Sequence, residues 1–333
     1  MNLKDKIGIH LDQIKQLRGI ENAVLTQRDG NPIQSTGVWF SKEEIFNVCS
    51  ATSAIFNVGI HLYPNQLRYI LIEGKKAKIL IAPLNNSVHS SLNRILEAQS
   101  ILDNKNEFFI AITAQPDVNL GGVFLQTSEC LKNIKTTLIT SGETFKPPLI
   151  QYNSGELDEI LQNFNIKKKG NNNQHLSSFS MDFSEILSWE LKKVMDNFSK
   201  SIIDLKFALI AMEGGYILSK VLKKNNSGIS NLDSFSAMSY SLYQTSNRCS
   251  WLLKRMNTDS ILIDCDNSFQ FINGLKDSVF SAVIGKARQK LGLIRLYLPQ
   301  FLKKMNNLIK DAKVERDVSS FDFKKLSGQL VIK

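Results

Sequence analysis

The sequence lacks most features that would place it outside the class of ordinary folded proteins. It has no C-x-x-C pair, and its 333 residues include only four cysteines: Cys49, Cys130, Cys249 and Cys265. Such sparse spacing argues against a disulfide framework and predicts reduced, buried thiols. No secretion signal opens the chain, and its longest apolar runs stop at charges before the roughly 18 residues that a membrane-spanning helix needs. We therefore expect a soluble, cytoplasmic protein.

Signatures of catalysis and of cofactor binding are also missing. No G-x-x-x-x-G-K-[ST] loop occurs, so the chain is not expected to be a P-loop GTPase, and Gly121-Gly122 lacks the other glycines of a dinucleotide-binding loop. No cysteine or carboxylate stands at metal-ligand spacing from the four histidines, His10, His61, His89 and His175. Spacing alone leaves a cysteine–histidine nucleophile pair open, but nothing favours one. The sequence predicts no metal, no cofactor and no enzyme activity of its own.

What the chain does have is a positive charge that is unevenly distributed. Lys and Arg number 41 against 31 Asp and Glu, a net charge of +10, and the excess is densest between residues 286 and 310. Apolar residues at helical spacing run through the same segment, so the favoured interpretation is a helix docked on the core with a solvated basic face. An acidic partner or an anionic membrane is the alternative. The predicted basic face consists of Lys286, Arg288, Lys290, Arg295, Lys303 and Lys304.

The two halves of the chain repeat one pattern of predicted elements. Each reads helix, strand, strand, helix, strand, strand, strand, helix. Ser50-Ala51-Thr52-Ser53 aligns with Ser236-Ala237-Met238-Ser239 at an offset of 186, and Gly30 aligns with Gly215 at 185. Leu120-Gly121 aligns with Leu291-Gly292 at 171, so the first copy carries 15 extra residues, the difference between offsets 186 and 171. Because the matches keep their order on the same elements, they indicate a duplicated domain.

The repeat divides the chain into predicted domains. The first spans 1–136, with a helical insertion at about 85–107, and the second spans 182–312. The linker at 137–181 is rich in Asn, Ser, Lys and Gly. The tail at 313–333 is weakly patterned, and its residues 329–332 either add a strand to an exposed edge or fray.

Short motifs recur at defined places in the repeated unit. The first copy has an Arg28-Asp29-Gly30 hairpin turn, Ala51-Thr52 in the second helix and Asn119-Leu120-Gly121 opening the last helix, whereas the second copy has Glu213-Gly214-Gly215 at its turn. With this order of elements, the unit resembles the Roadblock family, which includes Roadblock-type dynein light chains, Ragulator subunits and prokaryotic partners of Ras-like GTPases. The resemblance implies an α+β fold in which each unit is a five-stranded antiparallel sheet with helices on both faces. It also implies that two units pair through the central helix and an edge strand.

If the two units pair, one set of residues is expected to lie at the interface between the two halves of the chain or at the surface that a partner binds. Small residues on the central helices would let two helices approach closely; the alternative is that they face water or the sheet. Because both copies share one chain, effective concentration favours intramolecular pairing, and a homodimer stays open. The predicted pairing and partner residues are Ser50, Ser53, Ala54, Tyr69, Leu71, Ser236, Ser239, Tyr243 and Ile261.

Two functions from different classes follow. The resemblance implies a non-enzymatic platform that regulates or localises a Ras-like small GTPase. The alternative is a basic adaptor on an anionic membrane or a nucleic acid through residues 286–310. Nucleic acid is the weaker form of that alternative, because the basic segment lacks interleaved exposed aromatic residues for base stacking.

Overall fold

The computed structural model describes residues 2–38, 41–84, 108–140, 185–223, 232–252, 257–288 and 290–329, and their elements follow the expected order in both halves. The first half contains α1 (Leu3–Lys15), β1 (Ile20–Gln27), β2 (Pro32–Gly37), α2 (Lys42–Leu62), β3 (Leu67–Gly74), β4 (Lys78–Pro83), β5 (Phe108–Ala114) and α4 (Leu120–Thr140). The second contains α6 (Glu185–Ser201), β6 (Leu205–Met212), the 3-10 turn η2 (Glu213–Gly215), β7 (Ile217–Leu222), α7 (Leu232–Leu252), β8 (Thr258–Cys265), β9 (Ser268–Leu275), β10 (Ser278–Gly285) and α8 (Leu291–Gln329).

Local signals in the sequence account for several of these boundaries. Ser41 caps α2, its hydroxyl accepting a hydrogen bond from the backbone N–H of Glu44 at 3.1 Å. Asn119 does the same for α4, its side-chain oxygen accepting from the N–H of Gly121 at 3.1 Å. The turn between β1 and β2 is closed by Gly30, whose φ of +95° a side chain would disfavour.

One antiparallel sheet contains all ten described strands, in the order β2-β1-β5-β4-β3-β8-β9-β10-β6-β7. Read outward from the middle, both halves have the same order, as an approximate two-fold relation requires. The halves join at β3 and β8, where Leu71 is paired with Leu262 and Ile72 with Ile261. We call this β3–β8 junction the seam. The pairing of two five-stranded units through an edge strand, which the resemblance implied, therefore occurs within a single chain and gives one ten-stranded sheet.

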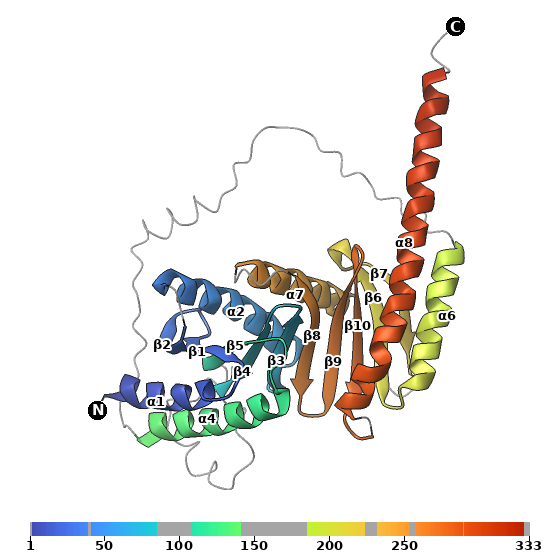
Figure 1. Ribbon diagram of the computed structural model, residues 1–333. Helices are drawn as coiled ribbons and strands as arrows, with labels where there is room; N and C mark the ends of the chain where they lie inside the picture. The colour runs from blue at the N-terminus through green and yellow to red at the C-terminus, as the bar shows by residue number, and fades with distance from the viewer. Residues whose placement is uncertain are drawn as a thin grey trace.

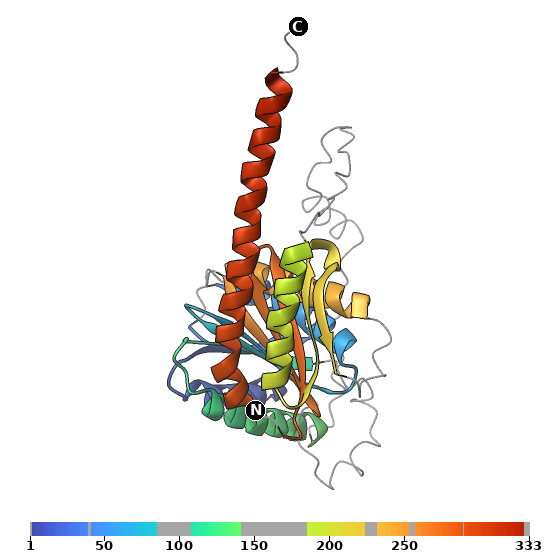
Figure 2. The same ribbon diagram turned by 90° about the vertical axis from the view of Figure 1, so that its right-hand side faces the viewer.

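Helices cover both faces of the sheet. On one face α2 and α7 lie side by side over the seam (Figure 1). On the other face α1 and α4 cover the first half, while α6 and α8 cover the second and stand next to each other in both views (Figures 1 and 2). The sheet is the middle of three layers, so its central strands are shielded from water on both sides.

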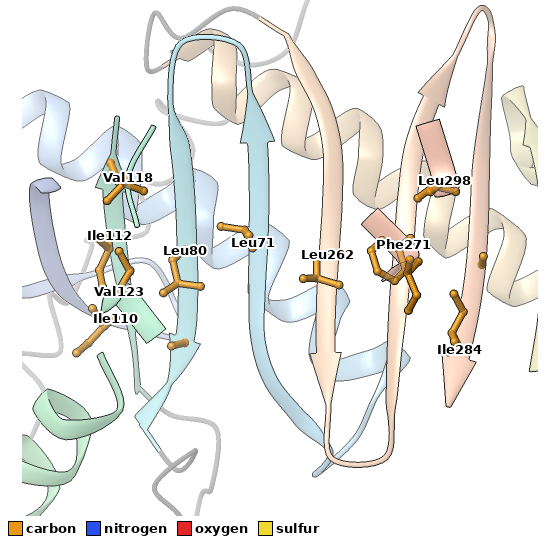
Figure 3. Packing of buried hydrophobic residues seen from close by; sticks show 14 of the residues in the cluster. Leu71, Leu80, Ile110, Ile112, Val118, Val123, Leu262, Phe271, Ile284 and Leu298 are labelled. Carbon is orange, nitrogen blue, oxygen red and sulfur yellow. The ribbon is translucent and has the colours of Figure 1, made fainter. Parts of the chain in front are cut away.

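The hydrophobic core continues across the seam. Leu80, Leu71, Leu262 and Phe271, from the adjacent strands β4, β3, β8 and β9, follow one another in this order on the same side of the sheet (Figure 3). Each is at most 4% exposed. A second cluster on the α2–α7 face also draws residues from both halves. Because burial of apolar surface contributes about 25 cal/mol per Å², the two halves stabilise each other across the seam.

Helix α2 corrects one expectation. With 21 residues and a mean hydropathy of 1.4 over its best window, it is long and apolar enough to cross a membrane, so the expectation that no segment reaches that length was wrong. It is the one such helix in the part of the chain that the structure describes. Its side chains Ile55 and Phe56 are fully buried against the sheet. The apolar composition of α2 is therefore explained by the core of the fold.

Helix α8 is longer than its apolar pattern suggests. The stripe that docks it ends at Ile309, but the helix continues to Gln329 and projects beyond the sheet (Figure 1). Between residues 311 and 327 no glycine or proline interrupts it, so much of the expected tail is helical. Residues 137–140 of the expected linker belong to α4. The insertion at 85–107, the remainder of the linker at 141–181 and the last residues of the expected strand lie outside the described residues.

The shared core predicts how the protein responds to a charge at the seam. Leu71→Asp or Ile261→Asp places a carboxylate where the native side chain is 1% exposed, and should lower the free energy of unfolding by at least about 4 kcal/mol. Because the core is continuous, we expect the single thermal transition to shift as a whole, as followed by circular dichroism. The matched control is Leu296→Asp, at a site 64% exposed, which should change stability by less than about 0.5 kcal/mol. A wild-type melt for Leu71→Asp would contradict the strand placement.

Candidate functional site

Helices α2 and α7 form a two-helix surface that spans the seam. Tyr63, which follows α2, packs edge-on against Phe235 near the start of α7, with ring centroids 6.3 Å apart, so the helices run antiparallel. Burial raises the pKa of the Tyr63 hydroxyl, and the nearby Cys265 adds to the shift. Both helices contribute to one buried cluster, which includes Ile55 and Leu242. The surface is therefore held as a unit.

Small residues on these helices accommodate the hairpin turns of the sheet. A Cβ atom on Gly30 would lie 3.2 Å from the Cα of Ser50, and one on Gly215 would lie 2.6 Å from the Cα of Ala237. Both glycines also have positive φ, +95° and +81°. The aligned glycines and small-residue segments thus meet each other in both halves, which explains why they occur together in the repeat.

This packing corrects the role expected of the small residues. The hydroxyl of Ser53 donates to the backbone carbonyl of Arg28, and that of Ser239 accepts from Gln270 Nε2 at 3.0 Å, so both bond within their own half. Ser236 is fully buried, whereas Ser50 and Ala54 are exposed. The alternative interpretation, sheet or water, therefore holds for these five residues. The structure thus places these side chains against the sheet, a turn or solvent, while the helices α2 and α7 themselves are in contact.

The other predicted pairing residues lie at or near the seam. Leu71 is on β3 and Ile261 on β8, each paired with a residue of the opposite half. Tyr69 is in register with Asp264 across the seam, and its ring stacks on Phe124 of α4 with centroids 4.4 Å apart. Burial, and secondarily the Asp264 charge, raises the pKa of Tyr69. Tyr243 donates a hydrogen bond to the carbonyl of Thr258 at 2.8 Å and so bonds within the second half.

The six residues of the predicted basic face do not share one helix. Lys286 follows β10 and pairs with the buried Asp264, its ammonium lying 4.7 Å from the Phe269 ring centroid. Arg295 on α8 reaches across the seam to Glu73, with Nη2 2.9 Å from Oε2. Of the other four residues of the predicted basic face, Arg288 and Lys290 precede α8, and Lys303 and Lys304 are exposed on α8. The single-face prediction was wrong because β10 runs to Gly285 and delays the helix to Leu291.

A small hollow of about 170 Å³ lies beside the seam, under α4. Tyr69, Arg68, Phe124, Thr127 and Asp264 are among the residues that line it. The Asp264 carboxylate in this hollow is already paired with Lys286, and no cysteine or histidine lines the hollow. Among the residues that the structure describes, no group of three metal-ligating side chains occurs. The hollow therefore has little chemistry of its own.

The four thiols are buried and protonated at neutral pH. Burial raises the pKa of Cys49 to about 11 and the pKa values of Cys130, Cys249 and Cys265 to about 12. The Cys130 thiol donates to the backbone carbonyl of His10 at 3.2 Å, while the His10 imidazole lies 3.0 Å from Thr137 Oγ1. A thiol in this state is a poor nucleophile. The contacts of Cys130 and His10 therefore join α1 to α4 and do not form a nucleophile–base pair.

The element order, the strand order and the α2–α7 pair define the class of protein: a Roadblock-like α+β fold, with the same arrangement in both halves. No family model and no curated protein matches the chain by sequence. Solved structures similar to part of it include MglB of Myxococcus xanthus, at 13% identity over 38% of this chain and 91% of that one, with a TM-score of 0.35. A Roadblock/LC7 domain from Streptomyces avermitilis is 11% identical over 40% of this chain and 97% of that one, with a TM-score of 0.31. The gliding protein MglB from Thermus thermophilus is 10% identical over 38% of this chain and 92% of that one, with a TM-score of 0.35.

The buried thiols predict a pattern of reactivity and of pH dependence. At about pH 8 none of the four cysteines should react with Ellman's reagent in the native protein, and all four should react after unfolding in guanidinium. The raised pKa values stabilise the fold fully below the thiols' ordinary pKa of 9.0, and this contribution is lost as pH rises toward about 11 to 12. Circular dichroism should therefore show alkaline unfolding in that window. A rapidly reacting native thiol would contradict the burial of the four cysteines.

The ion pair across the seam can be measured by a double-mutant cycle. Glu73→Gln and Arg295→Met should each lower stability, and the double variant should lose less than the sum, giving a coupling of about 1 kcal/mol. This modest value reflects side chains that are 20% and 31% exposed. Urea unfolding supplies the four free energies. Additive losses would show that the contact contributes nothing to joining the halves.

Proposed function

We propose that the protein is a non-enzymatic platform that binds and regulates a Ras-like small GTPase in the cytoplasm. One observation carries the proposal: two Roadblock-like halves are joined in one sheet, so that α2 and α7 form a ready-made surface over the seam. The family that the chain resembles includes partners of Ras-like GTPases. A surface that is assembled before binding needs no further ordering, which lowers the cost of association.

The outer side of α2 and α7 suits a protein partner. Ser50 and Ala54 on α2, with Ala237 and Ser241 on α7, are exposed and uncharged, and Phe46 is 45% exposed. Such residues form a surface of low relief that loses little hydration when it is covered, with an aromatic side chain at one end. Because the two helices differ in sequence, the surface is not two-fold symmetric. We therefore expect one partner molecule per chain, in one orientation.

Regulation of the partner would come from shape rather than from a catalytic side chain. On α2 and α7, arginine occurs once, as Arg248, exposed near the end of α7. We propose that binding orders or reshapes the switch loops of the GTPase.

An arginine finger would be worth about 10³- to 10⁵-fold in hydrolysis rate. If the protein stimulates hydrolysis, Arg248→Ala should keep that stimulation within about tenfold; a loss of the full effect would assign Arg248 as a finger instead.

The proposed surface predicts which substitutions abolish binding. Ala54→Arg and Ser241→Arg introduce large charged side chains at exposed positions of α2 and α7, and each should weaken binding at least about tenfold without unfolding the protein. The probes are the Ras-like GTPases of the same genome, loaded with GDP or a non-hydrolysable GTP analogue, in pull-down and titration experiments. The matched control is Ser188→Arg, exposed on α6 across the sheet, which should bind normally.

Two outcomes would decide against the proposal. Absence of binding by the wild-type chain in both nucleotide states would overturn the function. Equal loss in the α2, α7 and α6 variants, with circular dichroism unchanged, would overturn the choice of surface and leave the partner class in place.

A further inference from the structure

The outer face of α6 and α8 differs in charge from the equivalent face of α1 and α4. On α6 from Leu187 onward and on α8 as far as Asp311, the exposed charged residues are Lys192, Lys193, Lys200, Lys303, Lys304 and Lys310 against Asp311, while Glu190 and Asp196 on α6 are half-buried. On α1 and α4 they are Lys4, Lys6, Lys15 and Lys132 against Asp5, Asp12 and Glu129. Both helix pairs hold the same place in the fold (Figures 1 and 2). The excess of positive charge is therefore not required by the architecture.

Large apolar side chains stand exposed among these lysines. Trp189 on α6 is 62% exposed, and on α8 Leu293 is 46%, Leu296 64% and Tyr297 42% exposed. The core does not use them, because other residues dock these helices, including Phe198 on α6 and Ile294 on α8.

The Lys193 ammonium lies 5.2 Å from the centroid of the Trp189 ring. A tryptophan beside a lysine has an apolar body and a charged neighbour, which suits the boundary between water and hydrocarbon. Leu296, on the neighbouring helix, adds an aliphatic group to the same outer layer. Exposed aromatic and aliphatic groups interleaved with lysines are typical of surfaces that bind at the lipid interface.

We propose that the outer face of α6 and α8 binds the surface of an anionic lipid bilayer. The lysines lie near the anionic headgroups, each contributing about fivefold to the affinity, while Trp189 and Leu296 enter the boundary between headgroups and acyl chains. A nucleic acid would use the lysines but not the exposed aliphatic side chains, and a single tryptophan is no stacking platform for successive bases. The chemistry of this face therefore favours lipid.

Membrane binding is compatible with the proposed GTPase surface and does not depend on it. The α6–α8 face lies on the opposite side of the sheet from α2 and α7 (Figure 1). Both surfaces can therefore be occupied at once, and a partner on α2 and α7 would be held at the membrane.

Flotation of the full-length protein with lipid vesicles tests the proposal. The wild-type protein should bind vesicles of phosphatidylcholine that contain about one third phosphatidylserine, and should bind vesicles of pure phosphatidylcholine much more weakly. Its affinity for the anionic vesicles should fall steeply as the salt concentration rises. The triple variant Lys193→Gln, Lys303→Gln, Lys310→Gln should bind roughly 100-fold more weakly. Trp189→Ala should bind several-fold more weakly at unchanged charge.

The pseudo-equivalent half supplies the matched control. Lys4→Gln, Lys6→Gln, Lys132→Gln removes the same number of charges from α1 and α4 and should keep most of the binding. Equal loss in the two triple variants would show an effect of net charge only, and would overturn the assignment to this face. Absence of vesicle binding, or tighter binding of a DNA duplex that ignores Trp189→Ala, would overturn the lipid assignment. GTPase binding by the α6–α8 triple variant, measured in parallel, separates this result from the proposed function.

Discussion

Backbone pairing between β3 and β8 is the constraint on which the rest of the structure depends. Each half alone would end in an uncovered strand, an open row of hydrogen-bonding groups that invites association with other chains. Joining the two edges satisfies those groups and aligns Leu71 with Leu262, so that both apolar clusters continue from one half into the other. The packing of α2 against α7 and the Glu73–Arg295 ion pair exist because the seam brings these groups together.

Placing both halves in one chain also frees them to differ. In an assembly of identical copies, every surface is repeated by symmetry, and a change on one copy appears on the other. Here the outer face of α1 and α4 keeps a near balance of exposed charge, whereas that of α6 and α8 is strongly basic. The halves share strand order and turn geometry, which the core requires, and diverge on surfaces that the core does not constrain.

Much of the fold was predictable because its signals are local. The Ser41 cap, the Gly30 turn and the helical spacing of Leu3, Ile7 and Leu11 each depend on residues within one or two turns of chain. The pairing of the two halves agrees with the resemblance, and Leu71 and Ile261 do lie at the seam, but interpretations of several single side chains that needed a partner far along the sequence were wrong. Ser53 and Ser239 were expected between helices and instead bond within their own half. Arg295 was expected in solvent and instead pairs with Glu73, a contact that spans 222 positions.

The sequence by itself determined the order of elements, their repetition, and the places where the chain must turn, since backbone preferences and hydrophobic periodicity act over a few residues. Only the tertiary structure decided what those elements present to the outside. Whether a lysine is free or paired, as Lys303 is exposed but Lys286 bonds to Asp264, depends on which strand ends lie beside it. Whether an apolar residue belongs to the core depends on which side of its helix meets the sheet, and this is why Trp189 is exposed while Phe198, nine positions further on, is buried.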